Sequence, residues 1–287
     1  MKENSTHFRH LLELNLAMLF ISTSGVLGRY VDLPVPVTIC SRGVLAFVLL
    51  LIYCKIKGIS LKVRKQDIIL VLLSGVLMGL HWLTYFYSLR MSNVAIGMLS
   101  LFTYPVITAF LEPILLKTGF QKVHIFLGLL VLVGIFFLVP EFNLDNSATI
   151  AIGFGILSAI FYALRNLILK TKVRNYHGSM LMVYQTAIIG FVLLPSIFFV
   201  EFKEISAQWE GIVALAVLTT AVGHTLFLLT FKHFSITSVS IMSSVQPVFG
   251  IILGALFLSE IPNVTTIIGG LLILSSVLIE SIRSTKR

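Results

Sequence analysis

A repeated apolar unit constrains the fold of this chain more than any other feature. A shift of 142 residues carries Pro105-Val106 onto Pro247-Val248, and a shift of 144 carries the Phe-Val-Leu-Leu run at 47–50 onto the same run at 191–194. The matches keep their order along the chain. The chain is therefore one unit written twice, and both copies must fold in the same kind of environment.

That environment is lipid. Apolar residues make up 57% of the 287 residues and charged residues only 11%, with a mean hydropathy of +1.01. Soluble chains are about 25% charged, so this chain cannot cover itself with a polar surface. The net charge of +9 does not indicate nucleic-acid binding, because the basic residues lie in short gaps between apolar runs and form no basic face.

The apolar runs predict an all-α integral membrane protein with ten transmembrane helices. Each run has the length of a membrane-spanning helix, and helix is the structure that satisfies the backbone of such a run in lipid. The predicted helices are 11–31, 37–56, 67–89, 93–116, 122–140, 149–170, 178–200, 209–231, 235–258 and 263–282. They divide the chain into a tail (1–10), a first repeat (11–140), an external linker (141–148), a second repeat (149–282) and a second tail (283–287).

The lysine and arginine residues predict the orientation. With the N-terminus inside, inner segments and inner helix ends hold sixteen of the 21 basic residues, whereas outer segments hold only Arg90 and Lys203. This bias predicts that both termini are cytoplasmic, in the plasma (inner) membrane. Five helices per repeat is an odd number, so the two repeats have opposite orientations. Inverted repeats are typical of secondary transporters that work by alternating access.

Several segments resemble a known family. Arg29 lies near the end of the first predicted helix, and Arg42 leads an Arg-Gly-Val-Leu-Ala segment in the second. Polar and small residues precede a proline at 93–106 and again at 235–248, and Leu-Phe-Leu-Ser-Glu closes the ninth helix at 256–260. In these features, residues 12–282 are similar to the EamA-type transporters of the drug/metabolite transporter superfamily. The resemblance implies two five-helix repeats and transport of small metabolites.

The two repeats depart from each other and from the family pattern. Thr118 stands at the shifted position of Glu260, so the first repeat lacks the family glutamate. Thr186 stands at the shifted position of Arg42. A site between repeats that differ in this way should be asymmetric.

Three arginines lie within predicted spans, where each charge costs about 2.5–3.5 kcal/mol on insertion scales. Arg42 is close enough to its helix end to reach the interface with its long side chain, or it faces a cavity. Arg29 is nearer the outer surface and is expected to be an interfacial anchor. Arg165 shares a helix face with Tyr162 and Asn166, which favours a cavity lining.

The proline positions indicate a site. Tyr104 and Gln246 are shift-equivalent and each precedes a proline, which frees a backbone carbonyl one turn earlier. Freed groups at membrane depth are tolerated where they face protein or a water-filled cavity. The helices that the resemblance places around the pathway add the remaining polar and amphipathic candidates. The predicted substrate-binding residues are Arg42, Trp82, Tyr85, Tyr104, Tyr162, Arg165 and Gln246.

Three titratable residues are candidates for carrying a coupling proton. Glu112 is an acidic residue well inside a span, and it either couples to a proton or pairs with nearby Lys117. His81 and His224 lie in the third and eighth helices, where a histidine either carries a proton or bonds to a neighbouring helix.

These patterns predict a secondary transporter of small metabolites that exports amino acids or related organic anions. The alternatives are a promiscuous extruder of lipophilic compounds and a membrane-embedded lipid-modifying enzyme. The sequence has no run that indicates ATP hydrolysis, no metal-ligand spacing and no clustered acid–base residues. We therefore expect no enzyme activity, no metal and no cofactor. The expected partners are a small-molecule substrate, membrane lipid and a coupling proton, with the protein a monomer or homodimer and no nucleic acid bound.

Overall fold

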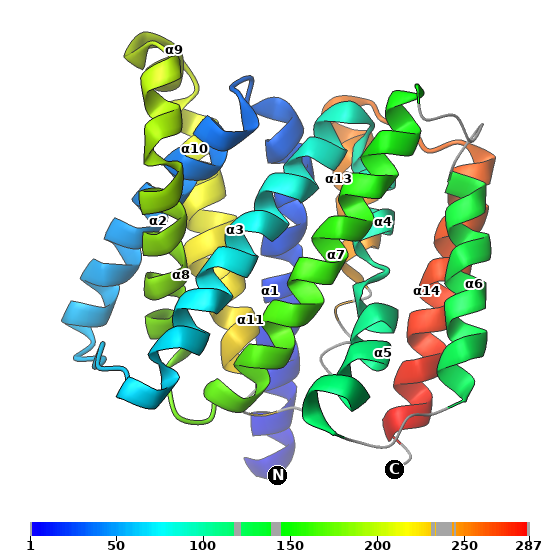
Figure 1. Ribbon diagram of the computed structural model, residues 1–287, viewed down its shortest axis with the longest axis horizontal. Coiled ribbons are helices and arrows are strands. Elements are labelled where there is room, and N and C mark those ends of the chain that lie inside the picture. Colours follow the sequence, from blue (N-terminus) through cyan, green and yellow to red (C-terminus); the bar gives the residue numbers. More distant parts are fainter. Residues whose placement is uncertain are drawn as a thin grey trace.

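The computed structural model describes residues 2–117, 122–138, 145–230, 233, 243 and 245–285, and within these residues it contains helices and no strands. The helices run mostly along one direction and form a bundle (Figure 1). The N- and C-termini lie at the same end of this bundle (Figure 1). The predicted all-helical architecture is therefore confirmed for the described residues.

Six helices follow from the first half of the chain. They are α1 (Lys2–Tyr30), α2 (Val35–Ile56), α3 (Ile68–Met91), α4 (Val94–Leu101), α5 (Tyr104–Leu116) and α6 (Val123–Leu138), with the short 3-10 helix η1 (Lys65–Asp67) before α3. Local sequence explains several starts. Proline follows the first residue of α2, and the Asn93 side chain caps α4 by accepting a hydrogen bond from the Ile96 amide.

The second half is divided into more segments. It consists of α7 (Ser147–Lys172), α8 (Gly178–Leu193), the 3-10 helix η2 (Leu194–Phe199), α9 (Phe202–Ala207), α10 (Trp209–Ala214), the π-helix η3 (Leu215–His224), α11 (Thr225–Thr230), α13 (Val245–Leu258) and α14 (Val264–Thr285). The Asn146 side chain caps α7, so the same side-chain chemistry starts α4 and α7.

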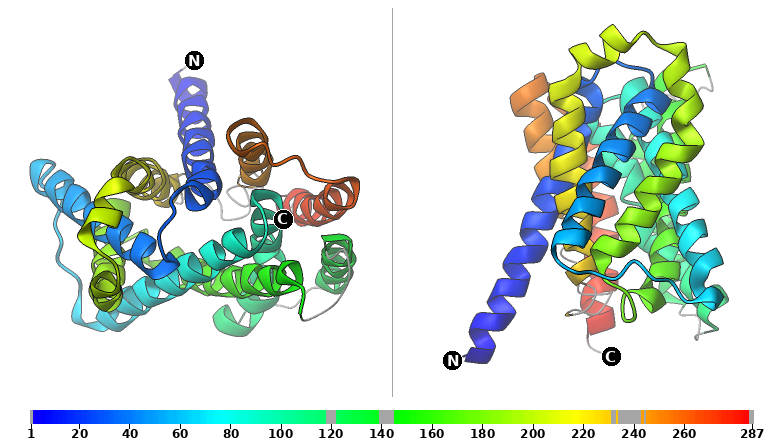
Figure 2. Two further views of the ribbon diagram at one scale, coloured as in Figure 1. Left: turned by 90° about the horizontal axis from the view of Figure 1, so that it is seen from above. Right: turned by 90° about the vertical axis from the view of Figure 1, so that its left-hand side faces the viewer.

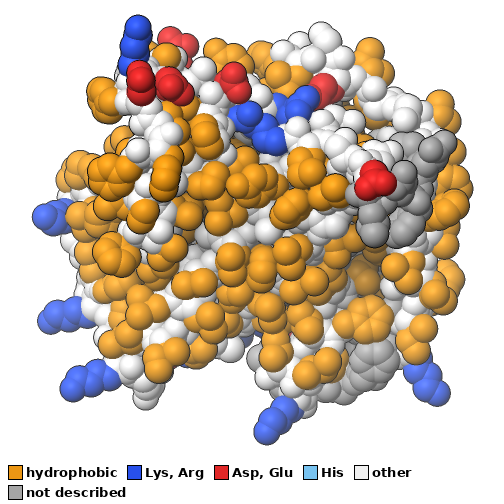
Figure 3. Space-filling view, turned by 45° about the horizontal axis from the view of Figure 1, so that its top comes forward, with side chains coloured by type: hydrophobic (Ala, Val, Ile, Leu, Met, Phe, Trp, Pro, Cys, Tyr) orange, Lys and Arg blue, Asp and Glu red, His pale blue; other side chains and the backbone are white. Residues whose placement is uncertain are grey.

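Six segments are long and apolar enough to cross a membrane. They are Val35–Ile56, Lys65–Met91, Val94–Leu115, Ser147–Lys172, Gly178–Phe199 and Trp209–Thr230. Shorter apolar helices occupy Ile125–Leu138, Val245–Leu258 and Val264–Ile279. The protein is thus an integral membrane protein. Apolar side chains cover the middle of the visible face, and acidic and basic side chains lie toward its edges (Figure 3).

Three predicted helices are not continuous α-helices. The helix predicted over 178–200 is α-helical only to Leu193 and continues as the 3-10 helix η2. The helix predicted over 93–116 is split into α4 and α5, because Pro105 lacks the amide that would continue the helix and lies instead in the first turn of α5. The helix predicted over 209–231 contains the ten-residue π-helix η3, whose wider turns are uncommon and often lie at functional sites. Most of the predicted stretch 235–244 lies outside the described residues.

α6 and α14 pack side by side at one edge of the bundle and contact the rest of it through α4 and α5 (Figures 1 and 2). Small residues bring the remaining helices close together around α4. A Cβ on Gly250 of α13 or on Gly25 of α1 would meet the Met98 side chain of α4. α4 is therefore packed tightly between helices from both halves of the chain, toward the end opposite the termini.

Candidate functional site

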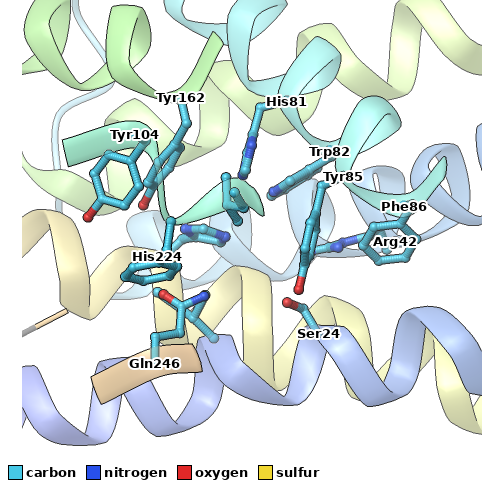
Figure 4. Close-up of a pocket in the computed structure, with 13 residues that line it drawn as sticks. Ser24, Arg42, His81, Trp82, Tyr85, Phe86, Tyr104, Tyr162, His224 and Gln246 are labelled. Atoms are coloured by element: carbon cyan, nitrogen blue, oxygen red, sulfur yellow. The ribbon is translucent and has the colours of Figure 1, made fainter. Parts of the chain in front are cut away.

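A small cavity lies where helices from both halves of the chain meet. Its volume is about 20 Å³, which is room for about one water molecule. Its lining comes from α1, α2, α3, α4, α5, α7, η3 and α13 (Figure 4). The lining residues are Ile21, Ser24, Arg42, His81, Trp82, Tyr85, Phe86, Leu101, Phe102, Tyr104, Tyr162, His224 and Gln246. The structure is therefore closed around a polar and aromatic centre.

Six of the seven predicted substrate-binding residues line this cavity, and Arg165 does not. The two histidines proposed for coupling, His81 and His224, line it as well. Tyr104 and Gln246, the two residues before the prolines, belong to different repeats and line the same space (Figure 4). Sequence analysis did not select Ser24, Phe86 or Phe102 for the lining.

Arg42 is the central charge of the site. Its side chain is fully buried, and its guanidinium lies 4.0 Å from the centre of the Trp82 ring and 5.4 Å from that of Phe86. The guanidinium is enclosed by the protein rather than exposed at its surface. It lies against aromatic faces, which attract a cation through their negative π surfaces.

The oxygen partners of Arg42 are two threonines of the π-helix. Nη2 donates to the hydroxyls of Thr219 and Thr220, each at 2.8 Å, and Nε donates to Thr220 at 3.2 Å. Within the described residues, no carboxylate pairs with this guanidinium. Sequence analysis missed both threonines, because nothing near Arg42 in the sequence indicates which distant helix it faces.

Several polar atoms at the cavity have no partner. Arg42 Nη1 and His224 Nδ1 are buried and make no hydrogen bond in the part of the chain that the structure describes. Figure 4 shows the Tyr85 hydroxyl directed toward the Ser24 side chain. Buried polar groups without partners are costly, so these atoms make the cavity the candidate place for a ligand or water.

The other polar residues connect helices around the cavity. His81 Nδ1 is 2.7 Å from the Ser158 hydroxyl of α7, and Ser158 also donates to the His81 carbonyl at 2.9 Å. The His81 ring stacks on Tyr162 at 4.5 Å between centroids. The Tyr104 hydroxyl lies 2.8 Å from that of Ser243. These contacts tie α3 to α7, and α5 to the segment before α13.

Arg165 lies behind this lining, between α7 and α8. Its guanidinium donates to Gln185 Oε1 at 2.9 and 3.2 Å and to Asn166 Oδ1 at 2.9 Å. It is fully buried, and its guanidinium is 5.8 Å from the centre of the Tyr162 ring. Each of the three guanidinium nitrogens of Arg165 donates a hydrogen bond within the protein, whereas Nη1 of Arg42 has no described partner.

Glu112 lies apart from the cavity. It forms an ion pair with Lys170 of α7 rather than with Lys117, so the predicted partner was wrong. The pairing differs because α5 packs along α7, whereas Lys117 follows the end of α5 in a left-handed conformation. About a third of each of the two paired side chains is exposed.

The described residues contain no group of three His, Cys, Asp or Glu side chains that could hold a metal ion. Two further hollows, of about 250 and 430 Å³, are lined almost entirely by apolar side chains. One lies between α2 and the segments η3 and α11, and the other lies between α5, α6 and α7. Neither brings charged groups together.

Comparison with known families gives a match that recurs along the chain. The EamA-like transporter family matches residues 11–139 and again residues 149–282. One solved crystal structure superimposes with a TM-score of 0.70 over 97% of this chain and 98% of that chain, at 14% identity, which shows a shared fold.

Individual relatives are also transporters by name. A pseudopaline exporter, CntI, from Pseudomonas aeruginosa is 26% identical over 78% of both chains. An uncharacterized transporter, YxxF, from Bacillus subtilis is 23% identical over 95% of this chain and 89% of its own length. An uncharacterized transporter from Archaeoglobus fulgidus is 26% identical over 68% of this chain and 70% of its own.

Proposed function

Because the chain belongs to the EamA-like transporter family, we propose that it is a secondary transporter that exports amino acids or related organic anions from the cytoplasm. The family and its named relatives are transporters, which supports transport over an enzyme activity. The observation that carries the anion proposal is Arg42, a fully buried cation with no described carboxylate partner and an unpartnered Nη1 at the cavity.

The charge at the site supports an anionic cargo. A cation buried at membrane depth is costly unless an anion or a polar group compensates it. Arg165 adds a second buried cation behind the lining, and its described partners are neutral as well. A carboxylate entering the cavity would be attracted by both charges and would complete the hydrogen bonding of Arg42. The relative named as a pseudopaline exporter supports metabolite export as the direction.

Alternating access is the mechanism we propose for this cargo. Ten helices in two inverted repeats would enclose the cavity, with residues 11–140 and 149–282 rocking about it. The cavity is lined by both halves and is too small for a metabolite in this closed form, as expected for a state between the two open ones. Each copy of the chain holds a complete cavity, so either a monomer or a homodimer could complete the cycle.

The proposed topology has both termini in the cytoplasm of the plasma (inner) membrane. The location of both termini at one end of the bundle supports it (Figure 1). The bias of lysine and arginine toward the predicted inner segments of the sequence supports it as well. Reporter fusions after Lys65 and Arg174 should give cytoplasmic signals, and fusions near Asp145 should give external ones. An external signal after Lys65 would overturn the ten-helix topology.

Export would be driven by a gradient or by exchange. Of the three candidate coupling residues, His81 and His224 line the cavity, where a proton and a cargo would influence each other. Glu112 lies outside it, in an ion pair with Lys170. We therefore favour the histidines over Glu112 if a proton is coupled.

Transport by purified protein in lipid vesicles tests the main proposal. Vesicles loaded with unlabelled compound should take up the labelled form by exchange, and acids should be better cargoes than their amides. Glutamate with glutamine and succinate with succinamide are suitable matched pairs. If no acid is exchanged in preference to its amide, the anion proposal fails even though the protein remains a transporter.

A promiscuous extruder of lipophilic compounds is the second candidate. The aromatic wall of Trp82, Tyr85, Phe86 and Phe102 favours it, because such rings bind flat apolar compounds by contact area. The same vesicles distinguish the two functions. An extruder would exchange lipophilic cations and neutral compounds as well as acids, and truncation of Tyr85 would weaken all of them alike.

A further inference from the structure

The contacts of Arg42 divide its guanidinium into a held part and a free part. Nε and Nη2 donate to Thr219 and Thr220, whereas Nη1 makes no hydrogen bond among the described residues. A guanidinium carries five N–H donors in one plane, and three of them belong to the held part. The free Nη1 contributes the other two at the cavity. The threonines therefore fix the plane of the guanidinium without covering it.

The hydroxyl protons of the two threonines are directed elsewhere. Thr219 donates to the Leu215 carbonyl at 2.6 Å, and Thr220 donates to the same carbonyl at 3.0 Å. A hydroxyl has a single proton, so these bonds leave both oxygens with lone pairs for Arg42. Because Leu215 begins the π-helix, the wider turns of η3 place two consecutive threonines at one carbonyl. The segment thus presents a pair of neutral acceptors to the cation.

Neutral acceptors differ from a carboxylate in one decisive respect. A carboxylate at this position would form an internal ion pair and cancel the charge of Arg42, leaving little attraction for an incoming anion. Threonine hydroxyls solvate the guanidinium and leave its full charge in place. The Trp82 ring, 4.0 Å away, is likewise neutral.

We propose that Thr219 and Thr220 are positioning residues that hold Arg42 through neutral contacts, so that its charge and its free Nη1 are reserved for a carboxylate of the cargo. This inference rests on the proposed function and names the residues that make the site selective for a carboxylate. The carboxylate would bind at the Nη1 edge, because the other edge is occupied by the threonines. Binding across both edges would first require Thr219 to be displaced.

Trp82 offers a direct measurement of this arrangement. The chain has two tryptophans, and Trp209 lies exposed at the start of α10, outside the cavity lining. In a Trp209→Phe background, the remaining fluorescence comes from Trp82, whose ring contacts the guanidinium. Titration with glutamate or succinate should change this emission, and the matched amides should change it much less.

Substitutions of Thr220 test the inference. Thr220→Ser keeps the hydroxyl and should bind the acid as the parent does. Thr220→Val and the Thr219→Val/Thr220→Val double variant keep the shape but remove acceptors, so acid affinity should fall about tenfold with little change for the amide. Thr220→Asp should abolish the preference for the acid, because the new carboxylate neutralises Arg42.

Thr186→Val is the matched control. Thr186 is also a fully buried threonine in a membrane helix, but its hydroxyl bonds to the Met182 and Val183 carbonyls of its own helix. This variant should keep the acid-to-amide ratio of the parent. A purely structural role for Thr220 would lower stability in its valine variant and leave that ratio unchanged.

The outcomes separate the inference from the proposed function. If the parent shows no preference for acids, or keeps it in Arg42→Gln, the anion site itself is wrong. If Arg42→Gln loses the preference but both valine variants of the threonine pair keep it, the anion site stands and the positioning role is overturned. Should Thr220→Asp fail to fold, the valine and serine variants still decide between these outcomes.

Discussion

Arg29 and Arg42 are both arginines inside helices of the first repeat, but their surroundings differ in kind. Arg29 donates to the Glu260 carboxylate at 2.9 Å and to the Leu89 and Arg90 carbonyls at the end of α3. Glu260 also accepts from the Val94 amide at 2.7 Å, at the start of α4. Arg42 has threonine hydroxyls and aromatic rings as its described partners.

The ion pair of Arg29 with Glu260, here called the rim pair, is complete within the protein. The cation lies at a helix C-terminus and the anion at a helix N-terminus, which is the favourable direction for each helix dipole. The pair connects α1, α3, α4 and the segment after α13, so it closes the end of the bundle opposite the termini (Figure 1). No external molecule is needed to complete it.

The contacts of Arg42 with Thr219 and Thr220 at the cavity are incomplete, because they include no balancing charge. Arg42 retains an uncancelled charge and an unpartnered donor in a region where both are costly. Natural proteins tolerate such local violations mainly where function requires them. The comparison teaches that burial of an arginine does not by itself indicate a binding site. The type of partner separates the structural arginine from the functional one.

The largest effect should follow from Arg42→Gln. We expect the preference for an acid over its amide to fall about 10- to 100-fold, corresponding to the loss of a charge-assisted hydrogen bond to the cargo. Stability should be kept or improved, because an uncancelled buried charge is removed. Exchange of glutamate and glutamine in vesicles measures the first effect, and thermal unfolding of the purified protein measures the second.

Arg29→Gln is the control for that variant. Because Arg29 is paired with Glu260, this substitution should lower the stability of the protein. The ratio of acid exchange to amide exchange should stay at the parental value. If Arg29→Gln and Arg42→Gln have the same acid-to-amide exchange ratio, the two arginines do not differ in their role in specificity.

Glu260→Gln should have the next largest effect, and on stability alone. The amide cannot balance the Arg29 charge, and the pair is only partly exposed, at 30% and 17% of the two side chains. We expect a loss of about 1–3 kcal/mol in the free energy of unfolding. Combining Glu260→Gln with Arg29→Gln should restore part of this loss, because no unpaired cation remains. A double variant with the full sum of both losses would argue against direct coupling.

Arg165→Gln should give a smaller change in specificity than Arg42→Gln. The Arg165 guanidinium is occupied by Gln185 and Asn166, so it attracts a cargo only through its charge. We expect the acid-to-amide ratio to fall about two- to fivefold, as for a charge acting through a medium of intermediate dielectric. Binding measured at low and high salt with the same matched pairs provides the test. A loss as large as that of Arg42→Gln would place Arg165 in direct contact with the cargo.

The sequence was sufficient to predict the helical membrane fold and most of the cavity lining. Periodicity and duplication identify Tyr104 and Gln246 as equivalent positions before prolines, and the structure brings both to one space. The partners of the charged residues were not predictable in this way. Thr219 and Thr220 are 177 and 178 residues from Arg42, and only the packing of α2 against η3 brings them together.

Local sequence was misleading in two places. Glu112 and Lys117 are close along the chain, yet the chain turns out of α5 at Lys117 and the glutamate bonds across to α7. Proximity in the sequence correctly indicated that Glu112 forms an ion pair with a lysine, but it indicated the wrong lysine. The break between α4 and α5 was obscured in the same way, because hydropathy alone does not separate one span from two short helices joined at a proline.

Glu112→Gln should have the smallest effect of these variants. Glu112 and Lys170 are each about one-third exposed, and exposed ion pairs contribute about 0–1 kcal/mol to stability. Since the pair lies outside the cavity lining, gradient-driven flux and exchange should both remain near parental values. Flux into vesicles with and without an imposed proton gradient measures this directly. If driven flux is abolished while exchange is kept, Glu112 carries the coupling proton. The residues that set the energy source would then lie at the periphery, separate from the central residues that select the cargo.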